Sequence, residues 1–531
     1  MIKSGEITVS KKTLLHVSEG IYRSAGSAIK ELISNAFDAN AQNVSITTNY
    51  PRFEFLSIQD DGDGMSISEF LRIVEGGIGD SNKASLETNN DRPIIGKLGI
   101  GILAIAQICR SFTIISHHKE TKTAFKGKMS FNPSVDKVAK ESKIDTTGKG
   151  YTAGTWKHEE NIDYDEKKAG VLIFSDDLRL AFKDRFKKSP QNLGEYPTIF
   201  KNYFKKIIED QFPTNHRTIK ELGPYHELIW ELANLIPVKY LGYGPIRDEY
   251  LDIITYYDNE KKLMNFLIDK QSELRDYNFN VMIDNINLSR FVHLPLPKYR
   301  DNRYQECQLY FFEFDKKVRN RRLAFKGYFF AQEFALYPRE LKGVQIRIKN
   351  VGIGLYDPSF LGFDQIQSPR DNWITGEIYV EEGLESALNI DRDSFNENDE
   401  HYYILRREVH KVLKEQVFPD VGKRFRARNK KSREMKAQKS IQKTKKQFNE
   451  VVKSYFPKLA YSFEANLNQI KFDRDNNEIK FPITILEGKL HKKREIFMSN
   501  IFEIYEDLKR VSNDDSKTKE FIKEISNLIL N

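Results

Sequence analysis

Three polar side chains in the segment ELISNAFDANA, residues 31–41, are spaced in a way that favours joint chemistry. Glu31, Asn35 and Asp38 follow one another at intervals of four and three residues, so an α-helix would carry all three on one face. That face would present two carboxylates and an amide oxygen, groups that can position a metal ion or a water molecule. An ordinary solvated helix face is the alternative, although such a face usually carries Lys or Glu rather than Asn beside alanines.

A strand that ends in a tight turn is expected just after this helix. The apolar run 55–58 leads into Asp60 and then into Gly62 and Gly64, which is typical of a strand followed by a turn. Glycines there let the backbone approach a ligand where a Cβ atom would collide. A calcium loop would need a bidentate Glu several positions later, whereas the chain from Met65 onward predicts a new helix. We therefore favour a turn that faces a ligand.

A third segment, GKLGIG at residues 96–101, combines a glycine-rich turn with an apolar stretch that we expect to be helical, followed by a strand at 112–115. A turn at a helix N-terminus offers N–H groups and the positive end of the helix dipole to phosphate oxygens. The segment is not a Walker loop, which needs Gly-Lys-Ser/Thr. The segment becomes significant together with the two before it, because all three follow one another within about the first hundred residues.

In this order the segments resemble the motifs of the GHKL ATPases, the superfamily of DNA gyrase, the heat-shock protein 90 chaperones, histidine kinases and MutL. The motif E-x-x-x-N-A-x-D-A is matched at 31–39, D-x-G-x-G at 60–64, and the glycine-rich motif at 96–101. The resemblance implies an α/β (α+β) protein whose N-terminal Bergerat sandwich binds and hydrolyses ATP with Mg²⁺.

The resemblance also implies roles for single residues. Glu31 would orient and deprotonate the attacking water, Asn35 would coordinate Mg²⁺, and Asp60 would accept a hydrogen bond from the adenine amino group. Phosphoanhydride hydrolysis depends mostly on positioning and charge neutralisation, which these groups could supply. One Asn is a reasonable protein ligand, because Mg²⁺ keeps several waters. The other nucleotide-binding residues implied are Asp38, Gly62, Gly64, Met65, Gly96, Lys97, Leu98, Gly99, Ile100 and Gly101.

Two further segments concern the nucleotide. A Gly-Thr-x-Ile/Val strand commonly closes the adenine pocket in this superfamily; here 170–173 has Val in place of Thr, and the Gly-Thr pair at 154–155 is an alternative. The segment 75–93 is rich in Gly, Ser, Asn and Asp, a composition typical of a mobile loop. It is either an ordinary surface loop or, by resemblance to chaperone and MORC lids, an ATP lid that brings Ser81 and Lys83 to the nucleotide.

The middle of the chain has strand-like runs at 308–314, 324–332 and 342–354, which resemble the transducer or middle domain of gyrase, MutL and the chaperones. We expect an ATP-binding domain at 1–215, a transducer-like α/β domain at 216–420, and a long basic helix with a helical C-terminal domain at 421–531. At 531 residues the chain is long enough for about three domains.

A transducer domain usually supplies a cation to the γ-phosphate, where a guanidinium would stabilise developing negative charge. Arg392, in the context LNIDRDSF, resembles the catalytic arginine of the heat-shock protein 90 chaperones. The alternative role for Arg392 is a salt bridge with Asp391 or Asp393. Arg347 and Lys349 are reserve candidates for the same cation.

Positive charge is concentrated in residues 423–446, which hold twelve Lys or Arg and one acid, Glu434, while the whole chain has a net charge of +8. This segment lacks Pro and Gly and is predicted to extend a helix that begins near Tyr402. It is either a solvated connecting helix or a contact surface for DNA, RNA or an acidic protein. Without interleaved aromatic residues, any nucleic-acid contact should show little sequence choice.

Beyond the basic segment we expect a helix over 448–463, a hairpin at Asn476 and Asn477, and helices over 495–530. The last stretch has an apolar stripe, interpreted as core-facing, with dimerisation as the alternative because GHKL clamps generally need a second protomer. A homodimer through the N-terminal and C-terminal regions is therefore expected. The stripe consists of Ile496, Ile501, Ile504, Leu508, Phe521, Ile525, Leu528 and Leu530.

Two cysteines, Cys109 and Cys307, exclude a disulfide framework and favour a reducing compartment. Since no stretch approaches eighteen uninterrupted apolar residues, we expect a cytoplasmic protein with no membrane partner. The leading functional hypothesis is an ATP-driven switch, similar in motif style to chaperones and to MORC proteins, including those of bacterial restriction and phage-defence systems. The alternatives are a nucleotide-gated binding module with little turnover and a histidine kinase, which would need a phosphoacceptor helix before the first motif.

Overall fold

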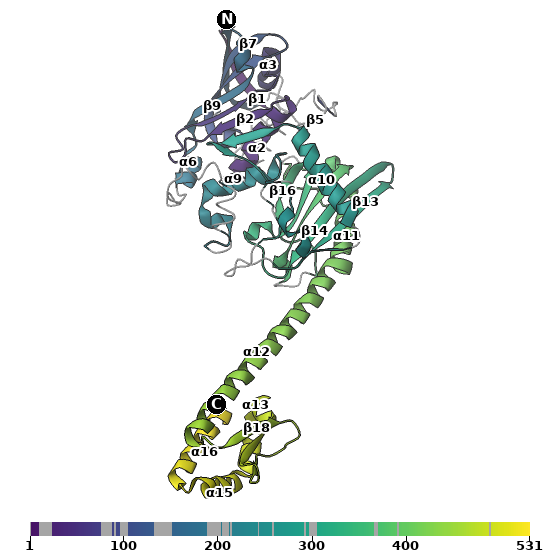
Figure 1. Ribbon diagram of the computed structural model, residues 1–531. Helices are drawn as coiled ribbons and strands as arrows, with labels where there is room; N and C mark the ends of the chain where they lie inside the picture. Colours follow the sequence, from purple (N-terminus) through teal and green to yellow (C-terminus); the bar gives the residue numbers. More distant parts are fainter. Residues whose placement is uncertain are drawn as a thin grey trace. The chain divides into compact units, whose positions relative to one another are not determined.

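Figure 1 shows the computed structural model of the chain, which divides into two compact units, Met1–Val421 and Gly422–Asn531. The boundary between the units falls inside one long helix, α12 (Phe418–Tyr455). The structure describes residues 2–9, 24–75, 88–89, 92–95, 105–131, 151–187, 203, 212, 215–242, 244–257, 260–290, 292, 294–296, 305–365, 370–389, 392–487 and 490–530.

The first unit contains a nine-stranded mixed sheet in the order β1-β8-β7-β6-β9-β3-β2-β11-β12. Its neighbouring strands are antiparallel except for β11, which runs parallel to β2. Because β11 and β12 come from residues after 216, this sheet draws strands from both sides of the boundary expected at 215. The strands are β1 (Ile2–Val9), β2 (Asn43–Thr47), β3 (Leu56–Asp60), β6 (Cys109–His118), β7 (Thr123–Phe131), β8 (Tyr151–Ile162), β9 (Gly170–Leu178), β11 (Asn280–Ile283) and β12 (Ile286–Asn287).

Helix α2 (Ala25–Asp38) confirms the helix predicted for the first motif. It begins at Ser24, whose Oγ accepts a hydrogen bond from the Ser27 N–H at 3.0 Å, a common N-cap arrangement. Its apolar side chains, including Ile29, Ile33 and Phe37, lie in the core of the first unit. Other helices of this unit are α3 (Ile67–Glu75), α6 (Leu180–Lys187), α9 (Pro224–Leu235), which packs against α2, and α10 (Glu260–Asp276).

A second, six-stranded sheet has the order β10-β13-β14-β17-β15-β16 and confirms the strands expected in the middle of the chain. Strands β15 and β16 are joined by Lys349 and Asn350, whose φ angles of +52° and +63° fit a tight turn of the type that connects twisted antiparallel strands. The strands are β10 (Ile254–Tyr257), β13 (Cys307–Val318), β14 (Arg321–Gln332), β15 (Gly343–Ile348), β16 (Val351–Asp357) and β17 (Ile374–Glu382).

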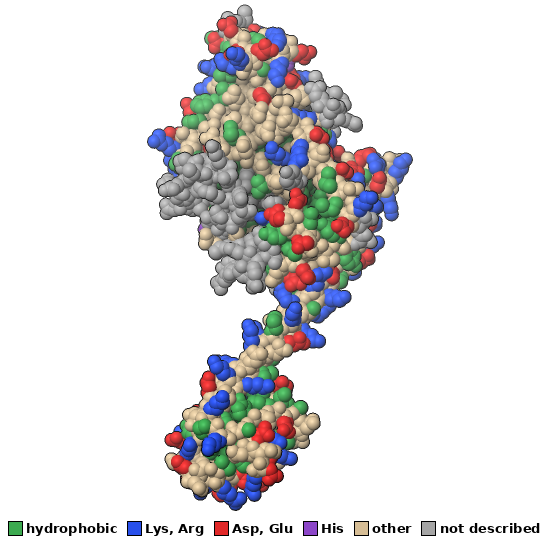
Figure 2. All heavy atoms as spheres, viewed as in Figure 1, with side chains coloured by type: hydrophobic (Ala, Val, Ile, Leu, Met, Phe, Trp, Pro, Cys, Tyr) green, Lys and Arg blue, Asp and Glu red, His purple; other side chains and the backbone are tan. Residues whose placement is uncertain are grey.

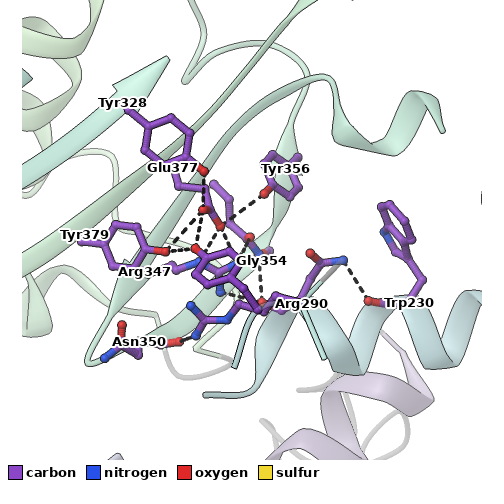
Figure 3. A network of polar contacts seen from close by, with 12 residues as sticks. Trp230, Arg290, Tyr328, Arg347, Asn350, Gly354, Tyr356, Glu377 and Tyr379 are labelled. Atoms are coloured by element: carbon purple, nitrogen blue, oxygen red, sulfur yellow. Dashed lines mark hydrogen bonds and ion pairs between the residues drawn. The ribbon is translucent and has the colours of Figure 1, made fainter. Parts of the chain in front are cut away.

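A buried ion pair fixes β15 to β17 at the centre of this sheet (Figure 3). The Arg347 and Glu377 side chains are both fully buried, with Arg347 Nε 2.8 Å from Glu377 Oε1. Hydroxyl groups of Tyr240 and Tyr328 each donate to Glu377 Oε2 at 2.6 Å. Burial alone would raise the pKa of Glu377, but Arg347, neighbouring cations and these hydroxyls outweigh it and hold the pKa at about 2. The carboxylate is therefore ionised and fully paired.

Helix α11 (Glu400–Val412) continues through a π-helical turn, Leu413–Val417, into α12, so the basic segment does extend a helix that begins near Tyr402. The helix predicted over 448–463 is wrong beyond Tyr455. Pro457 has no N–H to donate and disfavours a helical conformation at the preceding residue, so the helix ends and β18 begins at Ala460.

The C-terminal unit also holds a three-stranded sheet, β18-β20-β19, beside its helices. The hairpin predicted at Asn476 and Asn477 is confirmed by the antiparallel pairing of β19 with β20. The predicted stripe packs in or against the core of this unit and is confirmed as core-facing. The elements are β18 (Ala460–Glu464), β19 (Lys471–Asp473), β20 (Glu478–Pro482), α13 (Thr484–Glu487), α14 (Leu490–Ser499), α15 (Ile501–Ser512) and α16 (Asp515–Leu530). Among the described helices of the chain, none combines the length and apolar character needed to cross a bilayer.

Candidate active site

The polar face of α2 is largely withdrawn from solvent. The exposed fraction is 6% for Glu31 and 4% for Asp38, and Asn35 is half-buried. Asp38 Oδ1 accepts a hydrogen bond from the Ile95 N–H at 2.7 Å, which fixes the backbone directly before the segment 96–101. Asp38 therefore positions the chain that leads into the glycine-rich motif. The predicted residues Ser81, Lys83, Gly96, Lys97, Leu98, Gly99, Ile100 and Gly101 lie outside the described residues.

A cavity of about 270 Å³ lies beside α2, and its wall combines residues of this helix with residues of the second sheet. Helix α2 contributes Lys30, Glu31 and Ser34, and the second sheet contributes Lys349 from the β15–β16 turn. Arg392 completes the wall from the segment before α11. The predicted base and two of the three predicted cations thus line a single cavity. Its other lining residues are Ile94, Ile95, Ile348, Val351, Ile353, Glu385, Leu388 and Asn389.

Arg392 is held beside α2 by its sequence neighbour. Lys30 Nζ forms an ion pair with Asp393 Oδ1 at 2.5 Å, and the two side chains are 2% and 8% exposed. Asp393, one of the two partners expected for Arg392 in its alternative role, pairs with Lys30, and the other, Asp391, lies outside the described residues. Arg392 has a φ of +53°, a left-handed conformation that is uncommon for non-glycine residues. The segment therefore keeps the guanidinium at the cavity.

The electrostatic setting of Glu31 suits proton transfer. Burial raises the pKa of Glu31, while the positive charges of Lys30 and Arg392 act in the opposite direction. A carboxylate with a raised pKa is a stronger base than an exposed one, which favours abstraction of a proton from water. Both cations also balance the charge of the carboxylate within the protein.

Asp60 ends β3 and is held by backbone groups. Its Oδ1 accepts hydrogen bonds from the N–H groups of Gly62 at 2.9 Å and Val171 at 3.3 Å, and burial raises its pKa to about 6. A Cβ atom at Gly62 would lie 2.6 Å from the Ala39 carbonyl oxygen, and Gly64 has a φ of +81°. These two glycines are therefore required by close approach of the chain to itself, in addition to any approach of a ligand.

The strand that lies beside Asp60 is β9, which begins at Gly170. Val171, where the superfamily commonly has Thr, contributes its backbone N–H to Asp60. The alternative segment at 154–155 is wrong, because it lies on β8, which β7, β6 and β9 separate from β3. The Met65 N–H donates to Ser116 Oγ at 2.7 Å, so this turn is also fixed from β6.

Residues 22–150 match the family model described as "Histidine kinase-, DNA gyrase B-, and HSP90-like ATPase". They form a GHKL-type ATPase domain. The matched region includes α2 with Glu31, Asn35 and Asp38, and the β3 turn with Asp60. This identification confirms the superfamily predicted from the three motifs and supports ATP binding.

A search of curated proteins matched "Putative type II restriction enzyme HgiDII" from Herpetosiphon aurantiacus, which is 38% identical over 115 residues. The aligned segment covers 21% of this chain and 18% of the relative. The chain thus spans less than a fifth of the length of the relative.

Of the reserve cations, Lys349 is the one at the GHKL domain. Its Nζ donates to the Ile94 carbonyl oxygen at 2.9 Å, two residues before Gly96. Arg347 is fully buried, and its guanidinium donates to Glu377, to the Asn234 carbonyl oxygen at 2.7 Å and to Gln345 Oε1 at 2.7 Å. Arg347 therefore fixes the second sheet and cannot reach the cavity without breaking these bonds.

Two residues of the site were missed by sequence reasoning. Lys30 directly precedes Glu31, but its role depends on Asp393, which lies 363 residues later and which no local pattern connects to it. Ser116 is fully buried on β6 and bonds both the N–H and the carbonyl oxygen of Met65. A buried Ser within the strand at 109–118 was a weak signal, because alternating strand positions are more often apolar.

Proposed function

We propose that the chain binds ATP with Mg²⁺ beside α2, hydrolyses it, and uses the cycle as a conformational switch within a dimer. The observation that carries the proposal is that Glu31 and Arg392 line one cavity although several hundred residues separate them. A base from the GHKL domain and a guanidinium from the segment before α11 are the two groups that hydrolysis needs on either side of the reacting phosphate.

Each residue has a chemical role in this proposal. Glu31 takes a proton from the attacking water, and its raised pKa favours that transfer. Arg392 stabilises the negative charge that develops on the departing phosphate. Asp60 accepts a hydrogen bond from the adenine amino group through Oδ2. Its Oδ1 is held by two backbone N–H groups, whereas Oδ2 has no hydrogen bond to a described residue.

Asn35 fits a magnesium ligand. Its amide lies on the same face of α2 as Glu31, is half-buried and makes no side-chain hydrogen bond within the described part of the chain. Neutral and anionic oxygens are the ligands that Mg²⁺ prefers, and the ion keeps several waters and substrate phosphates in its shell. When bound, the ion neutralises charge on the phosphates.

Two contacts would transmit the nucleotide state to the second sheet. Lys30 holds the Arg392 segment through Asp393, and Lys349 bonds the backbone at Ile94, next to the glycine-rich motif. A shift of the backbone at Ile94 on nucleotide binding would therefore act on the β15–β16 turn. The restriction-enzyme name of the relative supports a DNA-related setting, such as bacterial defence, for this switch.

A second copy of this chain is the proposed partner. In the C-terminal unit Met498 and Phe502 are 66% and 81% exposed, which is unusual for large apolar side chains close together in sequence. Burial of such side chains favours association of two protomers. The mass in solution, measured by light scattering with and without ATP, should be that of a dimer, and Phe502→Glu should shift it toward the monomer.

The test of hydrolysis compares the ATPase rate and ATP affinity of the wild type with those of Glu31→Ala. Loss of turnover with retained ATP binding supports the proposal, and Glu54→Ala, which removes an exposed carboxylate, should behave as the wild type. Absence of turnover in the wild type would favour a nucleotide-gated binding module instead. Transfer of labelled phosphate to the protein itself would favour the kinase hypothesis.

A further inference from the structure

The basic part of α12, residues 423–446, is exposed over its length. Ten of its twelve cationic side chains are exposed: Lys423, Arg426, Lys430, Lys431, Arg433, Lys436, Lys439, Lys443, Lys445 and Lys446. Figure 2 shows Lys and Arg side chains along this helix. None of these ten forms an ion pair with a carboxylate of the described residues, and Glu434 is the only acid within the segment. The charge of these ten side chains is therefore not neutralised by carboxylates of the described residues.

The cations surround the helix instead of forming a stripe. Arg426, Lys431 and Lys436 are five residues apart, and five residues turn an α-helix by about 140°. Three exposed cations at this interval lie on three different sides of the helix. The whole basic part spans roughly 36 Å at about 1.5 Å per residue, with one cation for every two residues on average.

This distribution excludes two common partners. A helix that lies on a membrane needs a continuous apolar face opposite its charges, and the apolar side chains here are scattered, among them Phe425, Met435 and Ile441. A coiled coil with a second copy needs apolar residues every three and four positions, which the segment lacks, and like charges would oppose the pairing. The partner must therefore be anionic and must meet several sides of the helix at once.

We propose that the basic part of α12 binds double-stranded DNA by lying in the major groove and contacting phosphates on both sides. The major groove is about 12 Å wide and admits an α-helix, so phosphates border the helix on two sides, whereas a flat acidic surface would meet only one. The major groove of double-stranded RNA is too narrow and deep for this arrangement. Binding through phosphates is largely independent of base sequence. This inference does not depend on ATP hydrolysis.

The test measures binding of the full chain to a labelled 24-base-pair DNA duplex by fluorescence anisotropy, over a range of salt concentrations. The variant carries Lys430→Gln, Lys431→Gln, Arg433→Gln and Lys436→Gln, which keep helix-forming side chains and remove four charges. A matched control carries Lys492→Gln, Arg494→Gln, Arg510→Gln and Lys523→Gln, four exposed cations of the same unit outside α12. Circular dichroism checks that both variants remain folded.

We expect the wild type to bind the duplex with a steep dependence on salt. Each phosphate contact contributes about 0.9 to the slope of log affinity against log salt, so the α12 variant should lose about 3 to 4 from the slope. The control should match the wild type, and double-stranded RNA of the same sequence should bind more weakly than DNA. The proposal is overturned if the α12 variant and the control lose DNA affinity equally, or if the wild type does not bind DNA at low salt. Binding of polyglutamate or anionic vesicles in place of DNA overturns it as well.

Discussion

Lys30 and Asp393 form a buried ion pair that joins the helix of the GHKL domain to the segment that carries Arg392. Lys30 Nζ also lies 3.5 Å from the Arg392 carbonyl oxygen, so the one ammonium group holds two adjacent residues of that segment. Glu31 and Arg392 are the immediate sequence neighbours of the paired residues. The ion pair therefore sets the distance between the proposed base and the proposed catalytic cation.

Breaking this pair should be costly and should also disturb catalysis. Asp393→Leu leaves the buried Lys30 ammonium without its carboxylate partner and should lower the free energy of unfolding by about 3–5 kcal/mol, and Lys30→Met should also destabilise the fold. The double substitution removes both charges and should recover most of that stability. The stabilities of the two single variants and the double variant can be measured by urea unfolding followed by tryptophan fluorescence, since Trp156, Trp230 and Trp373 all lie in the first unit. Because the double variant no longer ties Arg392 to α2, its kcat should remain reduced; wild-type turnover would contradict this positioning role.

Arg392→Gly should separate the charge of this residue from its conformation. Glycine adopts a positive φ without the roughly 1–2 kcal/mol penalty of other residues, so the variant should be at least as stable as the wild type. ATP binding should persist, while kcat should fall on the order of 10³-fold, as for other arginines that act on a transferred phosphate. Arg319→Gly is the matched control, because Arg319 also has a φ of +51° but is exposed on the β13–β14 turn. Normal turnover of Arg392→Gly would rule out the catalytic assignment.

Asn35→Ala should remove the protein ligand proposed for Mg²⁺. Isothermal titration with ATP should show that Mg²⁺ strengthens binding to the wild type but no longer to the variant, because the amide oxygen is the group proposed to share the ion with the phosphates. Chelation of Mg²⁺ should weaken ATP binding by the wild type to the level of the variant. A variant that keeps the full effect of Mg²⁺ would show that another group holds the ion.

Nucleotide affinity should fall below about pH 6 through Asp60. A carboxylate accepts the hydrogen bond of the adenine amino group only when it is ionised, and burial raises the pKa of Asp60 to about 6. Below that pH the dissociation constant for ATP should rise toward tenfold per pH unit. Asp60→Asn should bind weakly at every pH and lose this dependence. The phosphates of ATP titrate equally with both proteins, so the difference between the two pH profiles reports Asp60 alone.

The same group affects stability in the absence of nucleotide. Since the pKa of Asp60 in the folded protein lies above the ordinary value of 3.8, the folded state binds the proton more tightly than the unfolded state. Its contribution to the free energy of unfolding therefore rises as the pH falls from about 6 to about 4. A wild type that gains no stability relative to Asp60→Asn in this range would contradict the raised pKa.

Glu377→Gln should destabilise the first unit by about 3–5 kcal/mol at pH 7, because it leaves the buried Arg347 without a countercharge. The pKa of Glu377 is lowered to about 2, so its stabilising contribution is present above about pH 4.5 and is lost as the pH falls toward 2. The difference between wild type and variant, followed by tryptophan fluorescence, should shrink over that range. Glu381→Gln on the same strand breaks an exposed ion pair with Lys326 and should cost less than about 1 kcal/mol.

Much of the local structure could be predicted from sequence. The spacing of Glu31, Asn35 and Asp38 predicted one helix face, and Asn477 predicted the position of a hairpin, because both signals depend on residues close together in the chain. The helix predicted across Pro457 failed where apolar periodicity was given more weight than the missing N–H of proline. The strand beside Asp60 required the sheet order, which decided between 170–173 and 154–155.

The sequence by itself determined the family of the N-terminal domain and the polar face of α2, since motif residues and helical spacing are local properties of the chain. Only the tertiary structure decided which cations meet that face. Arg347 and Lys349 are two residues apart and would share a face on a continuous strand, but β15 ends at Ile348 and Lys349 lies on the turn. Arg347 forms a buried ion pair with Glu377 and is therefore held away from the cavity. The ion pair between Lys30 and Asp393 instead holds the Arg392 segment at the cavity. Such pairings depend on the packing of two sheets and cannot be read from sequence distance.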